Sequence, residues 1–154
     1  MKEQIELLKQ TRKNILKTIE NFSFEKLNEI PKDFNNNIVW NFNHSIVTMQ
    51  LLIYKFSGLE MNINADIISK YKIGTKPEDN NLKEEFELLK SIAISSVEQL
   101  EKDYFNGIFK TYNKYTTSYN FTLKNIEDAI AFNNVHEGLH FGYVMAQLKA
   151  LNLK

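Results

Sequence analysis

The stretch NIEDAIAFNNVHEGLHFGYVMAQLKA, residues 125–150, carries the period of about 3.6 residues that is typical of an amphipathic α-helix. We expect this helix to begin near Asn125 and to continue almost to the C-terminus. Its inward row is predicted to be Ala129, Phe132, His136, Leu139, Tyr143, Ala146 and Ala150. Two histidines, His136 and His140, are four residues apart, so they should lie one above the other on the same side of the helix.

Three earlier stretches have the same helical period: roughly residues 2–21, about 38–57 and about 80–102. Asparagines at 35–37 can cap the start of the second stretch, and Gly58 is a natural stop after it. The predicted inward row of the first stretch is Ile5, Leu8, Ile15, Ile19 and Phe22, with Arg12 among them. That of the second is Trp40, His44, Val47, Leu51 and Tyr54, and that of the third is Leu82, Phe86, Leu89, Ala93, Val97 and Leu100. Four such helices predict an all-α fold, a four-helix bundle with long connections.

The connections between these helices differ in character. Ser23 suits the N-cap of a short helical turn that ends at Pro31, and residues 59–79 contain a predicted short helix at Ala65–Tyr71. Residues 103–124 resemble an irregular, aromatic-rich loop with some strand-like alternation, but no partner strand is evident elsewhere. The long links allow a crossover between the second and third helices. No repeat or boundary divides the chain, so residues 1–154 are predicted to form a single domain.

The composition excludes several classes of protein. Lysine plus arginine and aspartate plus glutamate number 19 each, so no net field attracts nucleic acid or an anionic membrane, and we expect neither as a partner. The chain has no cysteine, which excludes disulfides, thiolate metal ligands and a cysteine nucleophile. There is no apolar run of signal-peptide or membrane-span length. These features predict a cytoplasmic protein.

The three histidines are the strongest functional signal in the sequence. The i,i+4 spacing of His136 and His140 allows both imidazoles to approach one ion. His44 and His136 each interrupt an apolar row, so each should point into the bundle, where a buried imidazole needs a hydrogen-bond partner or a metal. Two interpretations follow: one metal ion gathers all three histidines, or they are ordinary core and surface residues.

Polar residues on the same two helices are candidates for supporting the imidazoles. Asn41 and Thr48 lie one turn either side of His44, while Asn133 and Gln147 continue the His140 row at intervals of seven residues. Such side chains can fix imidazole tautomers by hydrogen bonding. More often, residues of this kind are simply helix-surface positions.

Residues 136–140 read HEGLH, which matches the zinc-protease pattern H-E-x-x-H with Glu137 as a candidate catalytic general base. The supporting context is weak, because the extended form of the motif needs glycine at 143 and histidine at 146. This chain has Tyr143 and Ala146 there. Glu137 is therefore interpreted either as a residue near the open side of a metal ion or as a solvated surface glutamate.

Two segments resemble the DinB-like (DinB/YfiT) proteins: NNNIVWNFNHSIVTMQLLIYKFSG at 35–58, and TTSYNFTLKNIEDAIAFNNVHEGLHFGYVMAQLKAL at 116–151. The resemblance implies a four-helix bundle and one divalent metal ion bound by His44, His136 and His140. An all-nitrogen ligand set suits zinc, nickel, copper or iron, with zinc or nickel the leading candidates. Characterised relatives include transferases and isomerases that use low-molecular-weight thiols, which implies a small-molecule substrate, and a homodimer is a further expectation.

Three neutral imidazoles would leave such an ion an open position at which the pKa of bound water or thiol is lowered. The expectation is a metal-dependent enzyme, similar to a thiol S-transferase or a hydrolase. The alternatives are a non-catalytic metal-binding or stress-related structural protein of the same fold. Arg12 either reaches an anionic substrate group or forms an internal salt bridge, and Tyr115 and Tyr119 either roof a cavity or pack as core.

Overall fold

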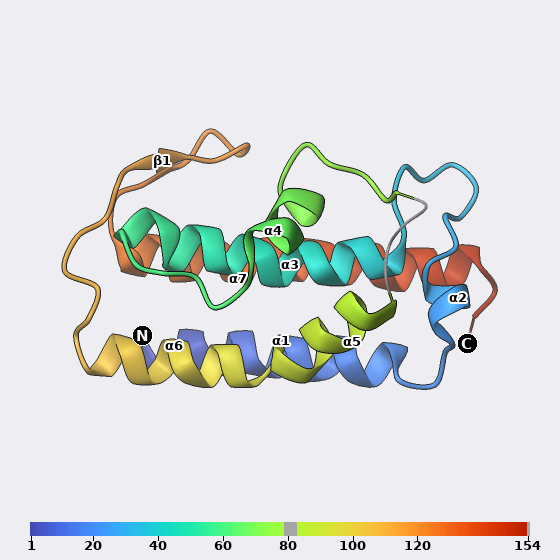
Figure 1. The fold of residues 1–154 in the computed structure, drawn as a ribbon, viewed down its shortest axis with the longest axis horizontal. Coiled ribbons are helices and arrows are strands. Elements are labelled where there is room, and N and C mark those ends of the chain that lie inside the picture. Colours follow the sequence, from blue (N-terminus) through green and yellow to red (C-terminus); the bar gives the residue numbers. More distant parts are fainter. Residues whose placement is uncertain (79–82, 154) are drawn as a thin grey trace.

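The computed structural model describes residues 1–78 and 83–153, and its long helices lie in two layers (Figure 1). In chain order the elements are α1 (Lys2–Ile19), α2 (Phe24–Leu27), α3 (Ile38–Ile53), the 3-10 helix η1 (Lys55–Ser57), α4 (Ala65–Tyr71), α5 (Lys83–Ile92), α6 (Ser95–Phe105), β1 (Tyr115–Thr116), β2 (Thr122–Leu123) and α7 (Ile126–Ala150). The all-α prediction is confirmed. Among the described residues, no helix is both long and apolar enough to cross a membrane.

The long helices do not alternate in direction along the chain. Figure 1 shows α3 and α7 side by side in one layer, with α1, α5 and α6 in the other. Helices α1 and α7 run one way, whereas α3 and the α5–α6 pair run the other way. The connection that carries η1 and α4 is therefore a crossover, one of the topologies that the long links allow.

Helix α3 is the centre of the core, and 14 of its 16 residues are buried. It begins where the Asn37 side chain accepts a hydrogen bond from the Trp40 backbone N–H at 2.8 Å. The chain turns away at Gly58, which has a left-handed φ of 72° that favours glycine. Helices α4 and α7 both contact α3, so polar side chains on α3 must find their partners inside the protein.

Helix α7 presents a different face from the predicted one. Leu139 and Tyr143, expected inside, are 41% and 44% exposed, whereas Asn133, Glu137 and Gln147 are fully buried. The prediction was wrong because apolar residues surround this helix, and polar residues on its true inner face meet polar partners from α1 and α3. Residues 129–148 contain a single charged side chain, that of the buried Glu137, so the outer face of α7 is uncharged between these two positions.

The predicted third helix is two helices, α5 and α6, with a break at residues 93–94. Its predicted inward row from Phe86 to Leu100 is nevertheless buried, while Asn80 and Leu82 lie outside the described residues. At the break the Val97 N–H bonds to the Ile94 carbonyl, and the Ala93 carbonyl instead accepts from Arg12 Nη1 at 2.8 Å. The arginine therefore satisfies a carbonyl that the break releases from the helical ladder.

The loop at 103–124 contains its own strand pair, which corrects the expectation of an irregular loop. Strands β1 and β2 are antiparallel, with Tyr115 opposite Leu123 and Thr116 opposite Thr122. The ring of Tyr115 stacks on Phe56 with centroids 4.5 Å apart, and the Tyr112 hydroxyl donates to the Leu52 carbonyl at 3.0 Å. These contacts hold the hairpin over the end of α3.

Candidate metal centre

The three histidines come together between α3 and α7. One potential ligand atom from each of His44, His136 and His140 lies within 4.8 Å of the other two. In residues 1–78 and 83–153 this is the only such group of histidine, aspartate or glutamate side chains. The i,i+4 spacing places His136 and His140 on adjacent turns, and their ring centroids are 4.4 Å apart. The structure therefore brings together all three residues expected from the sequence.

His44 is oriented by contacts on both of its sides. Its Nδ1 lies 2.6 Å from the backbone carbonyl of Tyr71, at the end of α4. A carbonyl only accepts, so Nδ1 carries the proton and Nε2 keeps its lone pair. The ring also stacks on Trp40, with centroids 4.5 Å apart and planes 9° apart. These contacts hold the His44 Nε2 lone pair toward the other two histidines.

His140 is held by a network of amides. Its Nδ1 lies 2.8 Å from Oδ1 of Asn41, whose Nδ2 donates to Oε1 of Gln147 at 3.1 Å and to the Asn37 carbonyl at 2.9 Å. Because the Asn41 nitrogen is committed to acceptors, its oxygen accepts the His140 Nδ1 proton. Nε2 of His140 is thus also left with a lone pair. The expectation that Asn41 supports the histidines is confirmed, and Gln147 acts through Asn41.

His136 is the ring whose second nitrogen has no protein partner. Its Nε2 lies 3.2 Å from Nε2 of His44, and its buried Nδ1 has no hydrogen-bond partner in the described part of the chain. Nitrogens at 2.0–2.1 Å from a tetrahedral zinc ion are about 3.3 Å apart. The separation of the two Nε2 atoms therefore fits a shared ion, which would neutralise the repulsion between facing lone pairs.

The surroundings keep the three imidazoles uncharged. Burial, with smaller contributions from His140 and His44, lowers the pKa of His136 to about 2. Burial, with a smaller contribution from His44, lowers the pKa of His140 to about 3. Burial also lowers the pKa of His44, against the hydrogen bond to Tyr71. Neutral imidazoles are the form that binds metal, so the residues present fit a divalent ion.

Glu137 lies within the core, and its contacts are with α1 and its own helix. Its carboxylate accepts from Arg12 Nη2 at 2.6 Å and from Arg12 Nε at 3.0 and 3.1 Å, with both side chains at most 1% exposed. Asn133 Nδ2 donates to the same carboxylate at 3.3 Å. The expectation of a solvated surface glutamate is wrong, and within the described part of the chain the hydrogen bonds and ion pair of Glu137 are with Arg12 and Asn133, not with a histidine. Of the two roles considered for Arg12, the structure shows the internal salt bridge.

Two cavities reach the histidine cluster. One, of about 460 Å³, is lined by His44, His136 and Thr48 and lies under the hairpin and α4. The other, of about 490 Å³, is lined by all three histidines together with Asn41 and Tyr119. Thr48 Oγ1 lies 3.3 Å from His44 Nε2, at the boundary between the cluster and the first cavity. Tyr115 lines the first cavity and Tyr119 the second, so these loop aromatics do cover cavities.

The fold and the site together define a class of protein. It is a helical bundle with a crossover connection, in which three neutral imidazoles converge beside two cavities and could hold a metal ion. The model of the DinB superfamily matches residues 7–144, which is most of the chain and includes all three histidines. The chain belongs to the DinB superfamily. No curated protein matches it significantly.

Proposed function

We propose that this protein is a metal-dependent enzyme that uses His44, His136 and His140 to hold one divalent ion and activate a thiol or water. The observation that carries the proposal is the arrangement of protons on the rings. Contacts with Tyr71 and Asn41 favour protons on Nδ1 of His44 and of His140, His44 Nε2 lies 3.2 Å from His136 Nε2, and one potential ligand atom of each of the three rings lies within 4.8 Å of the others. Zinc and nickel both suit this ligand set.

The number of ligands favours catalysis over storage or a structural role. Structural zinc sites have four protein ligands, whereas catalytic sites have three and keep one position for substrate. Here three side chains converge, and no fourth histidine, aspartate or glutamate within residues 1–78 and 83–153 joins them. Two cavities are lined by members of the cluster, so a small molecule can approach it.

A divalent ion on three neutral imidazoles retains its full charge and lowers the pKa of a thiol or water at its open position. The chain's own residues would position the reactants. The hydroxyl of Thr48, next to His44 Nε2, can donate to or accept from a group entering through the first cavity. Two cavities that meet at one centre suit a reaction between two molecules, which favours thiol transfer over hydrolysis.

The test is a screen of zinc- and nickel-loaded protein against low-molecular-weight thiols paired with electrophiles, with small esters as the hydrolysis arm. We expect thiol-dependent turnover that disappears in His44→Ala. A Thr48→Val variant should bind metal normally and lose part of the activity. Turnover that survives His44→Ala, or metal-loaded protein with no turnover in either arm, would count against an enzyme that works through this centre.

A further inference from the structure

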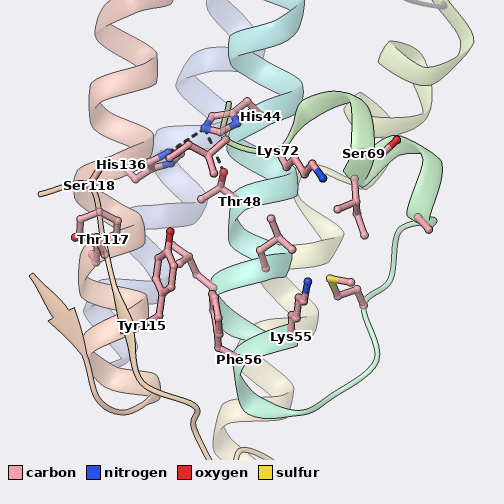
Figure 2. Close-up of a pocket in the computed structure, with 17 residues that line it drawn as sticks. His44, Thr48, Lys55, Phe56, Ser69, Lys72, Tyr115, Thr117, Ser118 and His136 are labelled. Atoms are coloured by element: carbon pink, nitrogen blue, oxygen red, sulfur yellow. Dashed lines mark hydrogen bonds between the residues drawn. The ribbon is translucent and has the colours of Figure 1, made fainter. Parts of the chain in front are cut away.

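The cavity of about 460 Å³ beside the histidines is built from three separate parts of the chain (Figure 2). Its floor is α3 and η1, with His44 and Thr48 nearest the cluster. Helix α4 and the residues after it form one wall, and the hairpin together with α7 forms the other. Its volume is within the range of small-molecule sites, which is roughly 300–1,000 Å³.

Most of this lining is apolar. Leu51, Leu52 and Phe56 come from the floor, Ile68 from α4, and Tyr115 and Phe132 from the opposite wall. An apolar lining of this kind gains free energy by covering the apolar body of a ligand. Tyr115 is itself fixed by its stack on Phe56, so this part of the wall is in place before a ligand arrives.

The charged residues of the lining are all of one sign. Lys55 and Lys72 line the cavity, and no aspartate or glutamate does. Figure 2 shows both lysine side chains on the α4 side of the cavity, across from the segment that carries Tyr115, Thr117 and Ser118. The neighbouring Lys70 forms a salt bridge with Glu85, whereas no acidic partner of Lys55 or Lys72 is found in the described ranges. Two cations beside an apolar wall produce a positive potential that favours an anion.

We propose that this cavity binds an anionic amphiphile, a molecule whose acidic group lies on Lys55 and Lys72 and whose apolar body extends toward His44 and His136. This inference deepens the proposed function by giving the chemical class of one substrate, and it rests on that function only for the reaction at the metal. The lysines and the apolar lining lie in the protein itself, so binding of the amphiphile does not require the ion.

The test compares three probes with the same eight-carbon chain and different end groups: octanoate, octan-1-ol and octylammonium. Isothermal titration calorimetry on the zinc-loaded protein should show the tightest binding for octanoate. In the Lys55→Gln/Lys72→Gln variant the octanoate affinity should fall roughly tenfold or more, to that of octanol. Lys76→Gln is the matched control, because Lys76 is exposed, lies four residues from Lys72 and is not part of the lining.

The same titration on metal-free protein separates this inference from the proposed function. Octanoate binding that needs Lys55 and Lys72 but survives removal of the metal supports an anion site in this cavity. That conclusion holds whether or not the protein proves to be a metal-dependent enzyme. Binding that is lost with the metal and unchanged in the double variant would place the carboxylate on the ion and overturn the assignment. Equal affinity for all three probes, or no binding of octanoate, would overturn it as well.

Discussion

The ion pair of Arg12 and Glu137 leads to a prediction about stability that separates a structural role from a catalytic one. Glu137→Gln keeps the shape of the side chain and removes the charge that faces the guanidinium. Both residues are at most 1% exposed, so Arg12 would be left as an uncompensated buried charge. Breaking a buried pair in this way costs about 3–5 kcal/mol. A loss of about 3 kcal/mol lowers the Tm of a domain of this size by roughly 6–12 °C.

Urea unfolding of the metal-free protein, followed by circular dichroism, measures this loss. Glu98→Gln is the matched control, since it makes the same change in the partly exposed surface pair with Lys9 and should alter the unfolding free energy far less. Arg12→Met/Glu137→Met removes both charges and should be more stable than Glu137→Gln. A Glu137→Gln protein as stable as Glu98→Gln would refute the structural role.

The same variant tests the general-base interpretation of HEGLH. Because the contacts of Glu137 are with Arg12 and Asn133, the folded Glu137→Gln protein should bind zinc with nearly normal affinity and keep most of its turnover. Loss of a general base typically lowers the rate by roughly 10²–10⁴-fold. A loss of that size in folded, metal-loaded protein would restore Glu137 as a catalytic residue.

Three other predictions follow from the site and from the surface of α7. Asn41→Leu removes the acceptor that fixes His140, so zinc affinity should fall about 10–100-fold in a competition assay; unchanged affinity would mean that Asn41 does not orient the ring. The metal-free protein should lose stability as the pH falls below about 6.5, by up to roughly 2 kcal/mol at pH 5 for each of His136 and His140, because the unfolded rings bind protons there and the folded ones do not. Urea titrations at several pH values check this, and a flat profile would contradict the buried, neutral rings. The uncharged outer face of α7, where Val135 is 54% exposed, can meet a second copy of itself without like-charge repulsion. Sedimentation should therefore show a homodimer, and Val135→Glu should dissociate it. A wild-type monomer would rule this face out as a self-association surface.

The sequence predicted most of the helices because their apolar spacing and their end signals agree. The inner row of α1 was predicted correctly, including Arg12, since charged residues on its outer side left only one apolar face. Helix α7 has no such contrast between a charged face and an apolar face. Its buried Asn133, Glu137 and Gln147 resemble surface residues until their partners on other helices are known.

The break between α5 and α6 was missed for a related reason. The residues around it are ordinary helix formers, and the contact that compensates for the break comes from Arg12, 81 residues away in the sequence. The hairpin was missed because both of its strands lie within the same connection, residues 103–124, whereas a partner strand was looked for elsewhere in the chain.

The three histidines of the candidate site were identifiable from spacing and position, but much of what orients them was not. The Tyr71 carbonyl that fixes His44 is a backbone atom, and any residue at position 71 would provide it. Asn41 was identified because it lies one turn from His44, although its bond is to His140 on another helix. The lysines of the first cavity are 17 residues apart and belong to different elements, and no local pattern connects Lys55 with Lys72.

Metal binding by the three histidines is tested most directly by titrating metal-free protein with zinc and with nickel. Trp40 is the only tryptophan and stacks on His44, so its fluorescence reports binding at this centre. X-ray absorption on the zinc-loaded protein then gives the ligands. We predict one equivalent of metal, a change in Trp40 emission, and three imidazole nitrogens at about 2.0–2.1 Å. Stoichiometry far below one equivalent, or undiminished binding in His136→Ala, would contradict the metal centre proposed for this protein.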